Sequence, residues 1–318
     1  MRMGRMNWQM RVLVKTILLM ATVIRGGADL MWGLRAYVIG CLAAAVLPFV
    51  LGVSVEAQRV TVTAAGTEIN PNNYGVLLSL GLLTCLYLFR ADGARAVKAL
   101  CVAGMLVLPV VLFLTGSRAT VVVIGLAILL QAVRLRWIVQ HPGRTLGWAA
   151  LGLLAAGTFL VAYSWLFSPE LLQRMTDVDY ALDSIGVRLR FIQESVSYAV
   201  SHPLGAGMGA WRGSTGHAVH NDLFYLLSNL GWMGPPVYVA LIVAVWRKAR
   251  KVPGSLDRWY AGVITLYVVL AGMGHTWLRT KFFWSFLAVP AIVLAVCHQH
   301  GIRRRFRPGE PAPVDIGP

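Results

Sequence analysis

Long runs of apolar residues recur along the chain, and they constrain its fold more than any other feature. A bilayer core about 30 Å thick requires roughly 20 apolar residues per helix, with about 17 to 25 tolerated. Eight runs approach this length, at residues 36–53, 74–90, 99–115, 119–134, 146–167, 222–246, 259–277 and 280–297. The runs are continuous rather than alternating, which favours helices over the strands of a barrel. The sequence therefore predicts an all-α fold, a polytopic bundle of about eight transmembrane helices.

A shorter apolar run, Val12 to Ile24, precedes these eight and contains Lys15. It is an interfacial helix, a signal sequence or a ninth span, and the sequence leaves these alternatives open. No small-residue cleavage site follows it, so we expect it to be retained. We treat residues 1–318 as a single membrane domain.

The distribution of charge predicts the orientation of this domain. Only 13% of the residues are charged, yet the formal net charge is +16. With eight spans and both termini in the cytoplasm, the inner segments hold 21 of the 29 basic residues and five acids, whereas the outer segments are neutral in sum. Positive residues orient helices towards the cytoplasm, so this bias accounts for the whole excess. We therefore expect no nucleic-acid partner, and we expect membrane lipid around the chain and a cytoplasmic tail at residues 298–318.

The sequence gives little support for a metal or a disulfide. The four cysteines lie in apolar runs without CxxC spacing, which argues against both zinc and disulfides. His217 and His220 are three residues apart, but no third ligand accompanies them at a suitable spacing. We predict no metal and no cofactor.

One long outer segment, residues 168–221, is the predicted periplasmic loop. Connections of this length inside a compact domain are usually functional. Its middle, Gly186 to Ser201, is predicted to form an amphipathic helix on the membrane surface, which His202-Pro203 ends. Gly205 and Gly207 follow, and they indicate either a flexible turn or a loop that approaches a ligand.

Three further polar positions lie where spans meet the outer face. Arg118, in the turn Thr115 to Arg118, either extends to the interface or binds a phosphate, for which a guanidinium is well suited. His220 precedes Asn221 where the loop re-enters the membrane. It is either a general base or acid, or an interfacial histidine beside a helix cap formed by Asn221. The Asx-rich segment around Asn72 is typical of helix capping.

Together these motifs resemble the membrane domain shared by O-antigen ligases and O-antigen polymerases, over roughly residues 29–294. Four features in order support the resemblance, and the last is followed by Gly231 and Gly234. They are Asn70-Pro71-Asn72, Thr115-Gly116-Ser117-Arg118, Arg188 fourteen residues before His202-Pro203-Leu204-Gly205-Ala206-Gly207, and His220-Asn221.

The resemblance implies an all-helical, metal-independent glycosyltransferase of the inner membrane that inverts the anomeric carbon. Its donor would be a glycan on a polyprenyl diphosphate, and its acceptor a glycolipid or glycan hydroxyl at the periplasmic face. Arg118 and Arg188 would bind the donor diphosphate, and His220 would assist the attacking hydroxyl. Secondary candidates are Ser117, Asn72, Arg190, Gly205, Gly207 and Asn221.

Ligation of O-antigen onto lipid A-core is the first functional hypothesis. A polymerase would use a second lipid-linked glycan as acceptor, and motifs for the leaving group do not separate the two. A transporter of polysaccharide or lipid is the alternative from another class. Transporters usually place charges or broken helices at the membrane midplane and often show repeats. The helix interiors here contain almost no charges, and we find no internal repeat.

Overall fold

In the computed structural model, the residues whose structure is described form a helical bundle. The described residues are 27–51, 54–56, 59–64, 67–132, 177–207, 210–216, 219, 221–274, 287–288 and 292. Four helical stretches among them are long and apolar enough to cross a bilayer, namely Gly27–Val46, Pro71–Ala91, Arg95–Leu114 and Asp222–Arg250. The predicted spans at 146–167 and 280–297 fall wholly or mainly outside the described residues, so the count of eight stays a prediction.

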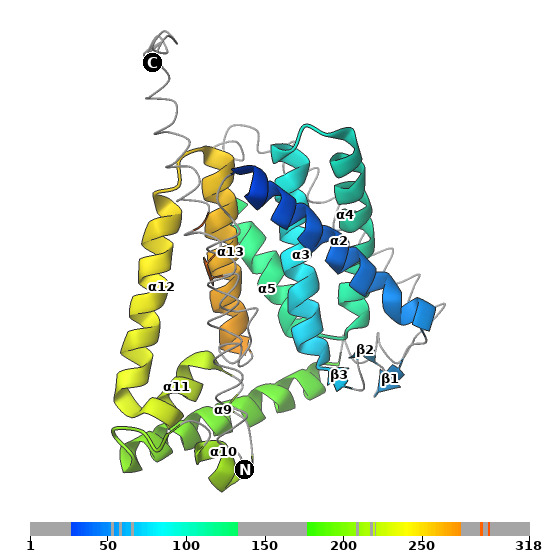
Figure 1. Cartoon of the computed structure of the whole chain (residues 1–318). Helices are drawn as coiled ribbons and strands as arrows, with labels where there is room; N and C mark the ends of the chain where they lie inside the picture. Colours follow the sequence, from blue (N-terminus) through cyan, green and yellow to red (C-terminus); the bar gives the residue numbers. More distant parts are fainter. Residues whose placement is uncertain are drawn as a thin grey trace.

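Five helices run roughly side by side along the bundle, α3, α4, α5, α12 and α13, while α2 crosses them obliquely and α9 lies across their lower ends (Figure 1). The bounds of the bundle helices are α2 Gly27–Leu51, α3 Pro71–Ala91, α4 Arg95–Leu114, α5 Arg118–Ala132, α12 Gly234–Arg250 and α13 Ser255–Gly274. At the lower end are α9 Val178–Ser201, α10 Ala210–Thr215, α11 Asp222–Leu230 and the 3-10 helix η1 Gly231–Met233.

Three short strands between α2 and α3 depart from the all-helical expectation. They are β1 Ser54–Glu56, β2 Arg59–Ala64 and β3 Thr67–Ile69, and they form an antiparallel sheet in the order β1-β2-β3. Ser54 pairs with Thr61, and Val62 pairs with Ile69. The β-branched residues of β2 favour an extended backbone. These strands were not predicted, because the segment is too short and too polar to resemble a membrane span.

The predicted span at 222–246 lies within one candidate span, Asp222–Arg250, but it is not one continuous helix. The structure divides it into α11, η1 and α12, and α12 starts at Gly234. Gly231 has a φ of +62°, a conformation that other residues rarely adopt and that interrupts the helix. The next helix then starts with prolines at its first turn, where their missing N–H groups are not needed.

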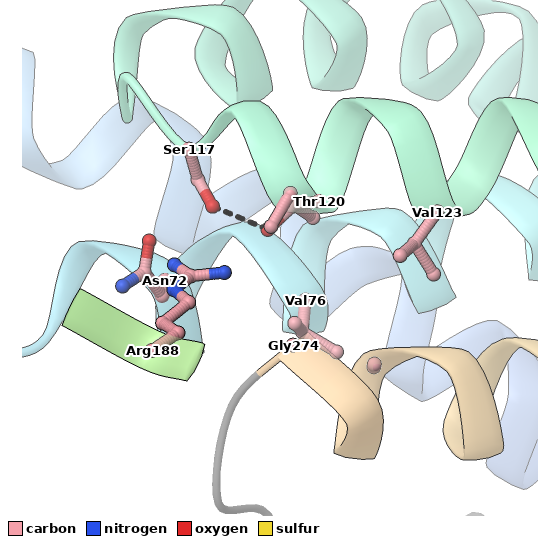
Figure 2. A pocket seen from close by; sticks show the side chains of 9 residues that line it. Asn72, Val76, Ser117, Thr120, Val123, Arg188 and Gly274 are labelled. Carbon is pink, nitrogen blue, oxygen red and sulfur yellow. Dashed lines mark hydrogen bonds between the residues drawn. The ribbon is translucent and has the colours of Figure 1, made fainter. Parts of the chain in front are cut away.

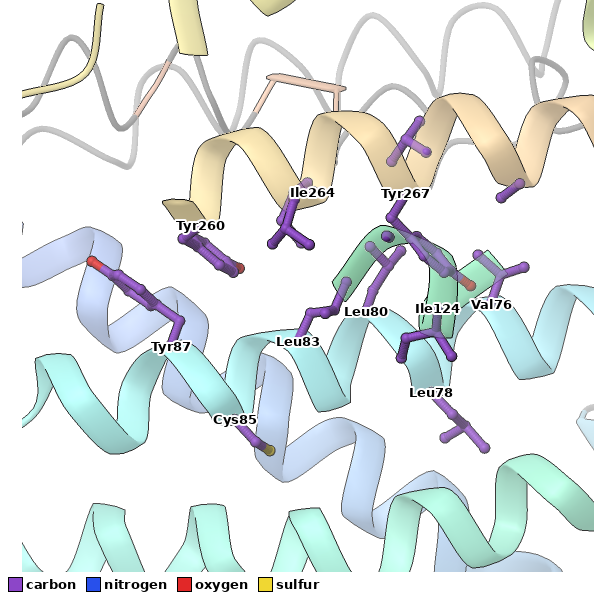
Figure 3. Packing of buried hydrophobic residues seen from close by; sticks show 14 of the residues in the cluster. Val76, Leu78, Leu80, Leu83, Cys85, Tyr87, Ile124, Tyr260, Ile264 and Tyr267 are labelled. Atoms are coloured by element: carbon purple, nitrogen blue, oxygen red, sulfur yellow. The ribbon is translucent and has the colours of Figure 1, made fainter. Parts of the chain in front are cut away.

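The hydrophobic core lies between α2, α3, α4 and α13. Figure 3 shows Tyr260 and Tyr267 of α13 beside Leu80 and Leu83 of α3, and all four side chains are fully buried. The ring of Tyr260 stacks on Tyr87 with a centroid distance of 4.3 Å, and its hydroxyl lies 3.0 Å from Thr84 Oγ1. The buried hydroxyls of Tyr260 and Thr84 are therefore paired, which a membrane interior favours.

At the upper end of the bundle, an ion pair joins α2 to the α3–α4 turn. Arg35 Nε donates to Asp92 Oδ2 at 2.8 Å, and Arg35 Nη2 lies 2.6 Å from the same oxygen. Asp92 Oδ1 accepts from the Ala94 N–H at 2.9 Å. The Ala94 N–H, followed by the Arg35 guanidinium, lowers the pKa of the Asp92 carboxyl below its ordinary value.

The amphipathic helix α9 starts at Val178, eight residues earlier than predicted, and ends at Ser201 as predicted. Ser195 and Ala199 are buried on its packed face, where α9 contacts α11. Beside that face, Leu182, Ile185 and Leu189 are more than half exposed. An exposed apolar stripe on a helix lying across the bundle end is typical of an interfacial helix.

Candidate functional site

A hollow opens at the lower end of the bundle, where α3 and α5 begin, α13 ends and α9 passes across. It is small and partly open, with about 20 Å³ of room for the centres of water-sized molecules. Four segments line it with nine residues, Asn72, Val76, Ser117, Ala119, Thr120, Val123, Arg188, Ala271 and Gly274 (Figure 2). Three of the predicted site residues, Asn72, Ser117 and Arg188, thus lie around one space.

The first turn of α3 forms one wall. Asn70 is the N-cap, and its Oδ1 accepts from the Asn72 N–H at 2.9 Å. Pro71 occupies the first helical position, where its fixed φ suits the helix. Helix capping, predicted for most of this segment, is therefore performed by Asn70, and Asn72 lines the hollow.

The turn between α4 and α5 forms the second wall. Gly116 has a φ of +61°, which lets the chain reverse within the turn. The hydroxyls of Ser117 and Thr120 are buried and lie 2.6 Å apart. A Cβ placed on Gly75 of α3 would lie 3.2 Å from both Thr115 Oγ1 and Thr120 Oγ1. Gly75 thereby allows this turn to pack closely against α3.

Arg188 contributes the cationic group of the hollow. It is half-buried on α9, and its guanidinium points towards Asn72 and the turn that holds Ser117 (Figure 2). No carboxylate in the described part of the chain forms an ion pair with it. The N-termini of α3 and α5 also point here, and helix N-termini favour anions. The hollow is therefore suited to a negatively charged oxygen-rich group.

Two other predicted arginines stand differently. Arg118 is the first residue of α5, next to Ser117, but its side chain lies outside what the structure describes. Arg190 is exposed and lies about 200° around α9 from Arg188, given 3.6 residues per turn. The structure does not bring Arg190 to the hollow.

The glycine-rich loop after α9 packs against the turn between α11 and α12. Gly205 has a φ of +83°, and a Cβ on it would lie 2.6 Å from the backbone of Leu230. The Gly207 N–H donates to Asn229 O at 3.1 Å, and the Trp232 N–H donates to Pro203 O at 3.1 Å. Gly205 thus packs against the backbone of Asn229 and Leu230 and not against open space. A Cβ on Gly207, by contrast, would meet open space.

The predicted base, His220, lies outside the described residues, as does His217. Its neighbours in sequence are described. Val219 is buried with Trp211 and Tyr225, and Asn221 caps α11. Asn221 Oδ1 accepts from the N–H groups of Leu223 and Phe224, and its Nδ2 donates to Met273 O at 3.0 Å. Met273 immediately precedes Gly274, which lines the hollow.

Sequence reasoning missed Thr120 and the α13 residues of the hollow. Thr120 is one helical turn from Ser117, so its spacing was a usable signal. Ala271 and Gly274 are small apolar residues at the end of a span, and no local feature distinguishes them. In the described part of the chain, no group of three or more His, Cys, Asp or Glu side chains is placed to hold a metal ion.

Residues 103–239 match a family model described as O-antigen ligase. No curated protein matches the chain. A solved chain, described with "Structural coordination of polymerization and crosslinking by a peptidoglycan synthase complex", is similar at 18% identity and a TM-score of 0.49. The similarity covers 94% of this chain and 90% of that chain.

Proposed function

Residues 103–239 match a family model described as O-antigen ligase, and from this similarity we propose that the chain acts as a membrane glycosyltransferase. The donor is a glycan on a polyprenyl diphosphate, and the acceptor is a sugar hydroxyl at the periplasmic face of the inner membrane. Our first candidate for the acceptor is lipid A-core, which makes the reaction a ligation.

The observation that supports this proposal is the position of the Arg188 guanidinium over the hollow between two helix N-termini. A diphosphate is the leaving group of the proposed reaction, so negative charge grows on it as the glycosidic bond breaks. A planar guanidinium pairs with phosphate oxygens through two parallel hydrogen bonds. Fixed dipoles and cations at such a position stabilise a transition state without reorganising.

The residues that line the hollow combine the polar and apolar chemistry that a lipid diphosphate would require. Asn72, Ser117 and Thr120 present an amide and hydroxyls beside Arg188, where phosphate oxygens would bind. Val76 and Val123 supply apolar walls further along α3 and α5. An anionic head beside an apolar wall is the arrangement that a lipid-linked diphosphate requires. Arg118, at the start of α5, is the proposed second cation.

The proposed chemistry is a single displacement. The acceptor oxygen forms a bond to the anomeric carbon as the bond from that carbon to the diphosphate oxygen breaks, and the diphosphate leaves with the bonding electrons. His220 accepts the acceptor's proton. Attack opposite to the leaving group inverts the anomeric carbon. Because the two arginines supply the positive charge, we propose that no metal ion is needed.

A polymerase, with a second lipid-linked glycan as acceptor, shares every feature of the leaving-group site. Glycolipid gels of a strain from which the gene is deleted separate the two reactions. A ligase defect leaves lipid A-core bare while long glycan stays on its lipid carrier. A polymerase defect leaves lipid A-core with a single glycan unit. Unchanged glycolipids would contradict the proposed function.

A purified sample tests metal independence. Transfer from a synthetic polyprenyl diphosphate donor should continue in the presence of a chelator. If the chelator abolishes transfer and one divalent ion restores it, then a metal rather than the arginines balances the diphosphate charge.

A further inference from the structure

Three consecutive residues in the last turn of α13, Gly272, Met273 and Gly274, each make a different contact. Gly274 lines the hollow, and a Cβ on it would lie 3.7 Å from Ala119 Cβ of α5. Met273 accepts a hydrogen bond from Asn221. Gly272 lies against Asp222. The same turn therefore touches both the hollow and the start of α11.

The contact at Gly272 depends on the absence of a side chain. A Cβ there would fall on Asp222 Oδ2 and lie 3.1 Å from the Tyr238 hydroxyl of α12. Asp222 is fully buried. As the first residue of α11, its carboxylate is favoured by the helix dipole. Asp222 thus fills the space over Gly272, where α11, α12 and α13 meet.

Asn221 makes the second contact with both ends of its amide. Its oxygen caps the first turn of α11, and its nitrogen donates to the Met273 carbonyl. The cap fixes the conformation of residue 221, and the bond to Met273 fixes its distance from α13. The side chains of Asn221 and Asp222 thus hold the start of α11 against the α13 turn that lines the hollow.

We infer that the Gly272–Gly274 turn is a positioning element, and that Asn221 and Asp222 are positioning residues for glycan transfer. They set the position of the start of α11, which follows His220 in sequence, relative to the hollow that Arg188 lines. This inference rests on the proposed function, in which His220 and the diphosphate act on opposite sides of one carbon. Misplacement by about 1 Å can lower such a rate by roughly 100-fold.

Two single substitutions loosen this link without removing the hollow. Asn221→Asp keeps an oxygen that caps Leu223 and Phe224 but loses the donor to Met273. Gly272→Ala places a methyl group against the Asp222 carboxylate. Each should lower turnover at saturating donor by about 10- to 100-fold, while the dissociation constant of the donor changes less than about threefold. The double variant Asp222→Ser with Gly272→Ala should be no slower than Asp222→Ser alone, because the smaller side chain makes room.

Two matched glycine variants serve as controls. Gly125→Ala puts a methyl group into open space on α5 and should leave turnover unchanged. Gly104→Ala puts a methyl group 2.5 Å from Cys85 Sγ, and neither residue lines the hollow, so it should lower thermal stability. It should not separate turnover from donor binding. If Gly104→Ala gives the same separation as Gly272→Ala, the effect is general packing and the inference is wrong.

Hydrogen exchange of residues 221–226 provides a readout that does not depend on activity. Exchange there should rise in Asn221→Asp and Gly272→Ala and stay unchanged in the α3–α4 hairpin. Unchanged exchange in both variants would overturn the positioning role, whether or not the protein is active. If the two variants exchange faster but the wild-type protein transfers no glycan, the proposed function is wrong, whereas the link between α11 and α13 remains supported.

Discussion

Two arginines that are two residues apart have different surroundings in α9. Arg188 is half-buried and directs its guanidinium into the hollow, while Arg190 is exposed on another side of the helix. Both carry the same charge and lie two residues apart on one helix. They are therefore a matched pair for separating directed hydrogen bonding from general positive charge.

Replacing Arg188 with lysine should lower transfer strongly, by roughly 10- to 100-fold, because a point charge does not reproduce bidentate contacts worth about 1.5 to 3 kcal/mol. Arg190→Ala should change transfer little. Initial rates and donor binding of the two purified variants make this comparison. Equal losses at both positions would indicate a diffuse electrostatic role instead.

His220→Ala should lower turnover by about 100- to 10,000-fold, the range for a lost general base, while the donor still binds. His217→Ala should have a mild effect, which distinguishes a base from a two-histidine metal site. Donor binding and glycan transfer must be assayed separately. Near-normal transfer by His220→Ala would remove the base from the mechanism, and loss of donor binding would make His220 a substrate ligand.

At this scale, the sequence indicated the residues with distinctive chemistry but not their neighbours. Asn72, Ser117 and Arg188 were predicted from motifs, and the structure brings them around one hollow. Gly75 and Gly274 matter because of what a side chain would meet across a helix interface. That information belongs to the tertiary packing, and no pattern within one helix contains it.

Among the elements, the loop after α9 and the α11–α12 turn fit together through two glycines. Gly205 closes on Leu230, and Gly231 has a positive φ and lies against Pro203. No side chain fits at either contact. The pair fixes the end of α9, the helix that presents Arg188, relative to α11.

Gly205→Ala should therefore destabilise the protein more than Gly207→Ala does. Both residues have positive φ, which costs an alanine about 1 to 2 kcal/mol. Only at Gly205 does the added methyl group also collide with backbone. Apparent melting temperatures in one detergent compare the two variants. An equal decrease in both would mean that backbone conformation, and not the close contact, determines the effect.

The ion pair between α2 and the α3–α4 turn should make stability depend on pH. The folded pKa of Asp92 is lowered from its ordinary value of 3.8, so its contribution is present above that value. The contribution should be lost as the pH falls through the lowered folded value. Asp92→Asn should therefore reduce the melting temperature at pH 7, and its difference from wild type should shrink as the pH falls below 3.8 and through the lowered folded pKa. A difference that does not shrink down to the most acidic pH at which the protein stays folded would contradict this assignment.

Element boundaries were predictable where a single cause sets them. The predicted runs 74–90 and 99–115 match α3 and α4 within a few residues, because the length of the apolar run sets the extent of both helices. The break at Gly231 to Met233 was missed because average hydrophobicity continues across it. The earlier start of α9 was not predicted, because Gly186 was interpreted as the start of the helix. In the structure Gly186 lies inside the helix.

For the whole molecule, the charge distribution predicts that the hollow faces the periplasm. Ser214, in α10, and Ser255, at the start of α13, are both exposed and belong to opposite ends of the bundle (Figure 1). A cysteine at position 214 should react with an impermeant thiol reagent in intact spheroplasts, and one at position 255 should not. The reverse pattern would contradict both the orientation and the location of the site.

The four separate segments around the hollow define how the chain can be divided. The stretch that resembles the family, residues 103–239, contains Ser117 and Arg188 but neither Asn72 nor Gly274. A fragment cut at those limits would lose two walls of the hollow. It would also lose the Met273 carbonyl of α13, which accepts a hydrogen bond from Asn221. The unit that is recognisable by sequence is thus smaller than the unit that forms the hollow. Chimeras between relatives must exchange residues 70–274 as one block if the hollow is to be transplanted intact.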